Sequence, residues 1–121
     1  MTMTTDLLTQ GDVERMIVAV SDELESETER YSAVSELSAD AEADFKGTFA
    51  VATIEVANTN RGDRTVTVNE RDAIAHQRSA DEFRRWKLLE SRRAASREAL
   101  LSLRARIDAL RTLASNLRHL T

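Results

Sequence analysis

The chain has 121 residues with no proline, three glycines, no cysteine and 31% charged residues, a composition typical of long helices and coiled coils rather than of β-sheets. The absence of cysteine excludes a disulfide scaffold and every thiolate metal site. Only five residues are aromatic, which leaves little bulk for a globular core. We therefore expect helices that need packing partners beyond their own chain.

Charge is distributed unevenly along the sequence. Residues 1–60 contain three basic and thirteen acidic residues, whereas residues 61–121 contain fourteen basic and eight acidic ones, for a net charge of -4. Two oppositely charged arms joined by a short turn predict an antiparallel helical hairpin. The basic arm is a candidate surface for an anionic partner.

The N-terminal part is predicted as a flexible segment over 1–11 followed by an acidic first helical arm over 12–58. Asp12 is the expected N-cap of this arm. A serine and an aspartate near 38–40 are cap-type residues, so a break there is an alternative to one unbroken helix. Glu27 falls on the mostly apolar stripe that recurs at steps of three and four residues and predicts one packed helix face. The stripe consists of Val13, Met16, Val20, Leu24, Glu27, Tyr31, Val34, Ser38, Ala41, Phe45, Phe49, Ala52 and Val56.

Residues 49–68 admit two interpretations around a predicted turn over 59–66. β-branched residues on both sides of the turn are compatible with a β-hairpin. The continuing stripe favours helix–turn–helix instead. The sequence Thr67-Val68-Asn69-Glu70 also fits a capping box, in which the Thr67 hydroxyl and the Glu70 carboxylate each satisfy a backbone amide of the other residue. We therefore expect a second helix to begin there.

The second helical arm is predicted over 67–120, basic overall and with a coiled-coil C-terminal half. Its seam alternates steps of four and three residues. Leu101, Leu113 and Leu120 widen the apolar face, which favours packing against more than one helix. The predicted fold is therefore all-α, a long antiparallel coiled-coil-like hairpin that self-associates into a homo-oligomer. The candidate helix-packing and oligomer contacts are Trp86, Leu89, Leu100, Leu103, Ile107, Leu110 and Leu117.

Catalytic and cofactor motifs are not found. His76 and His119 lack metal-ligand spacing, and the isolated Gly62 cannot build a phosphate-binding loop. No apolar run approaches the roughly 20 residues of a membrane span, and the start of the chain has no signal-type pattern. We expect no metal, no cofactor, no enzymatic activity, no membrane partner and a cytoplasmic location.

The basic residues are the group of side chains that indicates a function, namely binding of an anionic partner. Arginine pairs with phosphate in bidentate fashion, and Trp86, which lies among arginines, is a candidate for stacking on an unpaired base. Two alternatives stay open, namely that Trp86 belongs to the helix seam and that the arginines pair with the acidic arm. Binding would be sequence-independent and salt-sensitive. The candidate nucleic-acid contacts are Lys46, Arg61, Arg64, Arg71, Arg84, Arg85, Arg92 and Arg93.

Three segments resemble small helical-hairpin proteins of tailed bacteriophages, including recombination mediators of the UvsY type. They are Ala43-Asp44-Phe45-Lys46, Glu70-Arg71-Asp72-Ala73 and the terminal run from Leu103 to Leu113, and the resemblance covers roughly residues 40 to 118. It implies an oligomer of helical hairpins that binds single-stranded DNA and helps to load a recombinase in place of single-strand binding protein. Lys46 and Arg71 are the positions carried over from this resemblance. If the protein is phage-encoded, the expected cytoplasmic location is that of the host cell.

Two functions from different classes follow from these patterns. The first is a non-enzymatic, phage-type accessory protein that binds single-stranded nucleic acid as a helical oligomer. The second is a helical protein-interaction module, such as a host-takeover or virion component, that uses the face from Leu100 to Leu120 to contact other helices.

Overall fold

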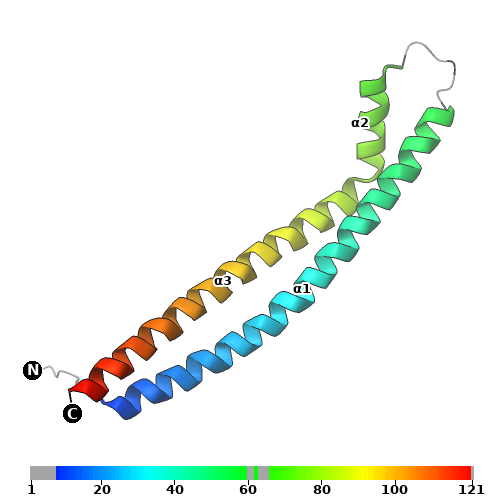
Figure 1. The fold of residues 1–121 in the computed structure, drawn as a ribbon. Coiled ribbons are helices and arrows are strands. Elements are labelled where there is room, and N and C mark those ends of the chain that lie inside the picture. Colours follow the sequence, from blue (N-terminus) through cyan, green and yellow to red (C-terminus); the bar gives the residue numbers. More distant parts are fainter. Residues whose placement is uncertain (1–7, 60–61, 63–65, 121) are drawn as a thin grey trace, which may run out of the picture. The chain divides into compact units, whose positions relative to one another are not determined.

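The computed structural model describes residues 8–59, 62 and 66–120, and these form three helices (Figure 1). They are α1 (Gln10–Thr59), α2 (Val68–Arg78) and α3 (Ala80–His119). The part of the chain that the structure describes contains no strand, so the all-α prediction is confirmed. On either side of the turn the backbone is helical up to Thr59 and again from Val68, which excludes the β-hairpin interpretation for the described residues of this region.

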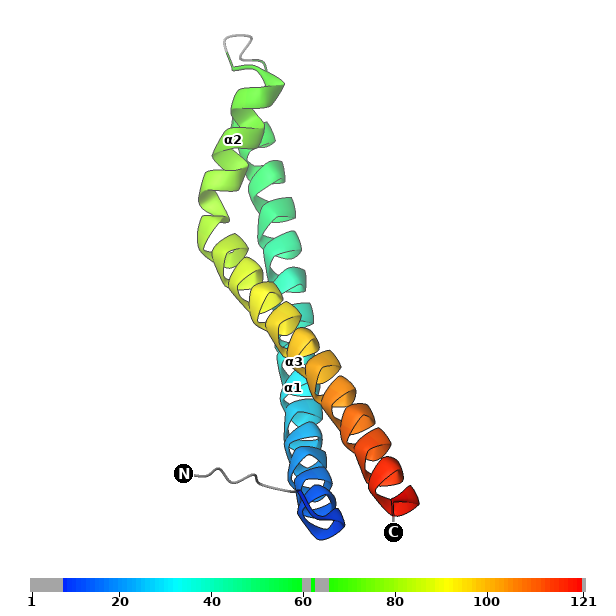
Figure 2. The ribbon, with the colours of Figure 1, turned by 90° about the vertical axis from the view of Figure 1, so that its left-hand side faces the viewer.

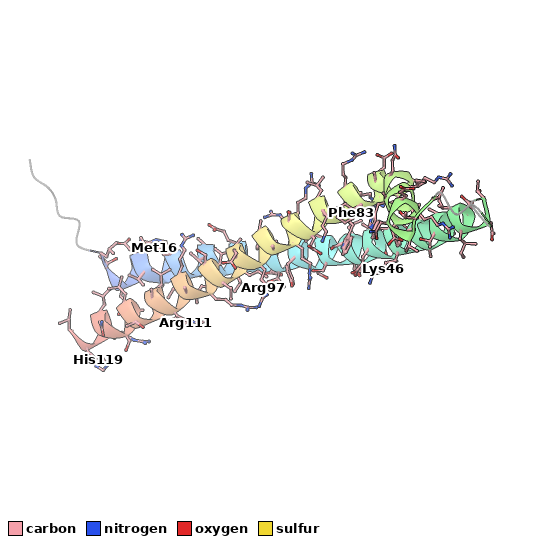
Figure 3. The ribbon with its side chains drawn as sticks, turned by 90° about the horizontal axis from the view of Figure 1, so that it is seen from above. Met16, Lys46, Phe83, Arg97, Arg111 and His119 are labelled. Atoms are coloured by element: carbon pink, nitrogen blue, oxygen red, sulfur yellow. The ribbon has the colours of Figure 1, made fainter. Side chains whose placement is uncertain are left out.

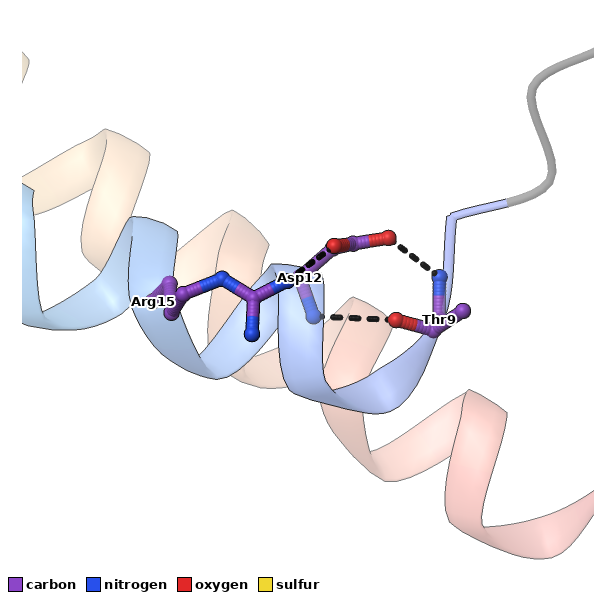
Figure 4. A network of polar contacts seen from close by, with 3 residues as sticks. All are labelled: Thr9, Asp12 and Arg15. Carbon is purple, nitrogen blue, oxygen red and sulfur yellow. Dashed lines mark hydrogen bonds and ion pairs between the residues drawn. The ribbon is translucent and has the colours of Figure 1, made fainter.

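Helix α1 starts two residues earlier than predicted, and its cap is Thr9 rather than Asp12 (Figure 4). The Thr9 backbone N–H donates to Asp12 Oδ2 at 3.0 Å, and the Asp12 N–H donates to Thr9 Oγ1 at 3.1 Å. This reciprocal arrangement is a capping box with Asp12 in the first turn. The pKa of Asp12 lies below its ordinary value, chiefly because of the bond from the Thr9 backbone, with Arg15 adding a favourable charge.

The predicted alternative of a break near 38–40 is wrong, because α1 continues as one helix to Thr59. Ser38 is only 6% exposed and lies on the packed face, whereas Asp40 points to solvent. Of the thirteen stripe positions on α1 eight are buried and only Met16 is exposed, so the predicted packed face is confirmed. Continuous packing along this face holds the helix together where isolated cap-type residues would otherwise favour an end.

The second arm is not the single helix predicted over 67–120. The capping box at Thr67 and Glu70 is confirmed and starts α2, but α2 ends at Arg78 and α3 begins at Ala80. Ser79 lies at the break with its side chain fully buried. Its hydroxyl donates to the Ala75 carbonyl at 2.8 Å, a contact that competes with the helical ladder and bends helices.

The chain divides into two compact units, each of which contains part of both arms. The terminal unit comprises Met1–Tyr31 and Ala95–Thr121, and the turn unit comprises Ser32–Ala94. Within each unit, α1 lies beside an oppositely directed segment of α3 (Figures 1 and 2). The antiparallel hairpin is therefore observed as a pairing of helices inside each unit.

The packed core of the terminal unit is small. Val20, Leu103 and Ile107 form a buried cluster, against which Leu24 and Leu110 pack while partly exposed. Two helices alone provide only one packed face each. Apolar side chains on their other faces therefore stay accessible in a single copy of the chain.

Candidate nucleic-acid interface and helix-packing groove

Three of the predicted nucleic-acid contacts in the turn unit pair with carboxylates of the same chain. Arg85 Nη1 lies 3.2 Å from Asp44 Oδ2, which links α3 to α1. Lys46 Nζ lies 3.4 Å from Glu42, and Arg84 forms an ion pair with Asp81 one turn away. All three pairs are largely exposed, so each contributes little stability, but each provides the cation with a partner.

The other predicted contacts that the structure describes lie on α2 and α3. Arg93 lies on α3 and its Nε donates to Ser35 Oγ at 3.2 Å, while Arg71 is half-buried on α2. Arg92 is exposed on α3 and makes no ion pair among the described residues. The predictions for Arg61 and Arg64 fall outside the described residues.

Trp86 belongs to an aromatic cluster instead of standing free as a platform for a base. Its ring stacks on Phe45 with centroids 5.5 Å apart, and Phe83 meets it edge-on at 6.0 Å. Lys87 Nζ lies over the indole at 4.2 Å from its centroid. Phe49 extends the cluster through its contact with Phe45 at 5.8 Å. These contacts favour the interpretation of Trp86 as a seam residue.

The charge difference between the arms is largely balanced inside each unit. The turn unit contains ten basic and eleven acidic residues, and the terminal unit contains seven basic and ten acidic residues. Arg78 pairs with Glu55 at 3.6 Å and Arg106 with Glu23 at 3.8 Å, so both units join a basic residue of the second arm to an acidic residue of the first. With Arg85 and Asp44, these ion pairs show that part of the charge split reflects pairing between the arms.

Most of the predicted oligomer contacts are used inside one chain. Leu89 in the turn unit and Leu100, Leu103 and Ile107 in the terminal unit are at most 8% exposed. Trp86, Leu110 and Leu117 are half-buried. The apolar seam thus pairs α3 with α1, and any surface for a further helix must lie beside this seam.

Such a surface exists in the terminal unit as a groove between α1 and α3. The groove has a volume of about 430 Å³ and its floor and walls are mostly apolar. Glu23 and Arg106, which form the 3.8 Å ion pair, lie at its rim. We call this surface the terminal groove; its other lining residues are Met16, Ala19, Val20, Ala109 and Leu110.

A buried polar contact interrupts the apolar packing of the terminal unit. Glu27 is 7% exposed and Ser96 6% exposed, and Ser96 Oγ donates to Glu27 Oε1 at 3.1 Å. Arg30, one turn along α1, pairs with the same carboxylate. A buried polar pair in a helix seam stabilises less than apolar packing but favours one register over others.

Among the described residues, no three histidine, aspartate or glutamate side chains are grouped so that they could hold a metal ion. None of the described helices combines the length and apolar character needed to cross a membrane. No protein-family model, curated protein sequence or solved structure matches this chain.

Proposed function

We propose that this protein is a non-enzymatic, self-associating helical module in which the terminal groove packs against the same groove of a second copy. The observation that supports this proposal is the exposed apolar lining of the groove. Met16 is 41% exposed, and Ala19 and Ala109 are also exposed, although all three line an apolar strip. Removing such a strip from water favours association by about 25 cal/mol for each Å² of apolar surface.

The charges at the rim favour a second copy as the partner. Glu23 and Arg106 are 58% and 57% exposed and have opposite signs. A two-fold axis places a surface against its own image, so each rim offers both signs to its partner and no excess of like charge accumulates. Two terminal units joined in this way form a four-helix bundle, in which each helix has apolar neighbours on two sides.

Cysteine crosslinking tests this arrangement, because the native chain has no cysteine. Ala109→Cys places a thiol in the groove, and Val18→Cys places one at a 60% exposed position, about 200° around α1 from Met16. With a short bismaleimide, we expect Ala109→Cys to form a covalent dimer and Val18→Cys to stay largely monomeric on a denaturing gel. Equal crosslinking of the two variants at every protein concentration would contradict the proposal.

Binding of single-stranded DNA by a phage-type recombination accessory stays a prediction that rests on the resemblance and on the basic residues. In the turn unit a phosphate would have to replace the carboxylate partners of Lys46, Arg84 and Arg85. Because these cations already have partners, the structure supports nucleic-acid binding by the turn unit less than it supports self-association through the terminal groove. A recombinase or single-strand binding protein as partner, and the cytoplasmic location, likewise stay predictions.

A further inference from the structure

Four arginines of α3 recur at intervals of seven residues within the terminal unit. They are Arg97, Arg104, Arg111 and Arg118, which we call the arginine row. Seven residues are close to two helical turns, so successive members lie on the same side of the helix, about 10.5 Å apart along its axis. The labelled Arg97 and Arg111 can be followed along α3 in Figure 3.

The row is separate from the residues already described. None of its members lines the terminal groove, and none belongs to the predicted contacts in the turn unit. All four side chains are exposed. The nucleic-acid contacts predicted from the sequence do not include these four arginines, because that prediction concerns basic residues near Trp86 and the turn.

Three cations of the row, those of Arg97, Arg104 and Arg111, are weakly compensated within the described structure. Arg97 and Arg104 make no ion pair with any residue that the structure describes, and Arg111 is 3.9 Å from Asp108 with both side chains more than 65% exposed. This contrasts with Arg85 and Arg106, which reach across to carboxylates of α1. Guanidinium groups of this kind are available for a bidentate contact with an external anion.

We infer that the arginine row is a binding site for the phosphodiester backbone of nucleic acid. A repeated row suits a ligand whose charge also repeats along a line, and each phosphate contact releases condensed counterions. Carboxylates on a protein helix offer a poorer match, since exposed ion pairs between side chains contribute little to binding. The row itself contains no aromatic side chain, so binding at the row uses phosphates without base stacking and is independent of sequence.

The test compares two triple variants with equal change of charge. The row variant carries Arg97→Gln, Arg104→Gln and Arg111→Gln, and the control carries Arg78→Gln, Arg84→Gln and Arg85→Gln, whose cations all have carboxylate partners. Fluorescence anisotropy with a labelled single strand and the matching duplex is recorded over a salt series. Circular dichroism checks that both variants stay helical.

For the native chain we expect binding at low salt. The slope of log Kobs against log salt should reflect about 0.7 per phosphate contact on a single strand and about 0.9 on a duplex. Each single row substitution should reduce the slope by one such increment, and the row variant should lose binding while the control keeps the native slope. The single-strand and duplex arms show which form of the backbone the row prefers.

Three results would overturn the inference. The first is no binding by the native chain at low salt, and the second is an equal loss in the row variant and the control. The third is displacement by poly-glutamate at the same charge concentration as effectively as by unlabelled nucleic acid, which would make the row a site for acidic polypeptides. Because the row and the terminal groove share no residue, failure here leaves the crosslinking result unaffected.

Discussion

Replacing Phe45 with alanine is expected to lower the free energy of unfolding by about 3–5 kcal/mol. Phe45 is 8% exposed and its ring contacts three others, those of Phe49, Phe83 and Trp86, with centroids 5.2 to 5.8 Å away. The substitution removes a large apolar side chain and the ring contacts that join α1 to α3. Urea unfolding followed by fluorescence of the single tryptophan measures the effect within this cluster.

Phe83→Ala is the matched control, because Phe83 belongs to the same cluster but is 39% exposed. We expect a clearly smaller loss from this variant. If Phe45→Ala leaves too little folded protein, Phe45→Leu provides a second variant. Leucine preserves most of the buried volume, so this variant should fold. It should still unfold at a lower urea concentration than the native chain, because it lacks the ring contacts. An unfolding free energy for Phe45→Ala within about 1 kcal/mol of the native value would contradict the packing described for the turn unit.

Replacing Glu27 with leucine is expected to raise the free energy of unfolding by about 1–3 kcal/mol, the opposite of a typical core substitution. The Glu27 carboxylate is removed from water yet gains only the Ser96 hydroxyl and the Arg30 side chain as partners. Arg30 is 70% exposed, so it remains hydrated after the change. Leucine continues the apolar stripe on both sides of this position. Chemical denaturation at neutral pH measures the difference.

Glu29→Leu provides the control for Glu27→Leu. Glu29 is exposed and has no ion pair among the described residues, so its replacement should leave the unfolding free energy within about 0.5 kcal/mol of the native value. A loss of stability in Glu27→Leu would show that the buried polar contact stabilises the terminal unit. In that case the contact would raise the free energy of unfolding in addition to favouring one register of the helices.

Helical periodicity and capping could be predicted because both are local properties of the sequence. The stripe on α1 and the box at Thr67 and Glu70 depend on spacings of three and four residues. The break at Ser79 could not be predicted in this way, since a serine at this spacing continues the helical pattern and is fully buried, as Ala75 four residues earlier is. Whether its hydroxyl donates to a backbone carbonyl depends on the bend that the packed helices adopt.

The candidate sites depend on which residues of the two arms meet. The sequence contains Arg85 and Asp44 but does not show that they are neighbours, because 41 residues separate them. Predicting the terminal groove requires knowledge of how α1 and α3 face each other. Met16, which is predicted on the packed stripe, lines the groove and stays exposed. The arginine row did carry a sequence signal, namely its seven-residue spacing, and the structure adds that Arg97 and Arg104 make no ion pair with a described residue.

Sedimentation equilibrium on the native chain, Met16→Glu and Val18→Glu tests the central claim most directly. Both substitutions place a carboxylate at an exposed apolar position of α1, but only Met16 lines the groove. We expect the native chain and Val18→Glu to approach at least twice the 13.6 kDa chain mass as concentration rises. Met16→Glu should stay near the mass of one chain over the same range. A native chain that remains at the single-chain mass up to its solubility limit would contradict self-association through the terminal groove.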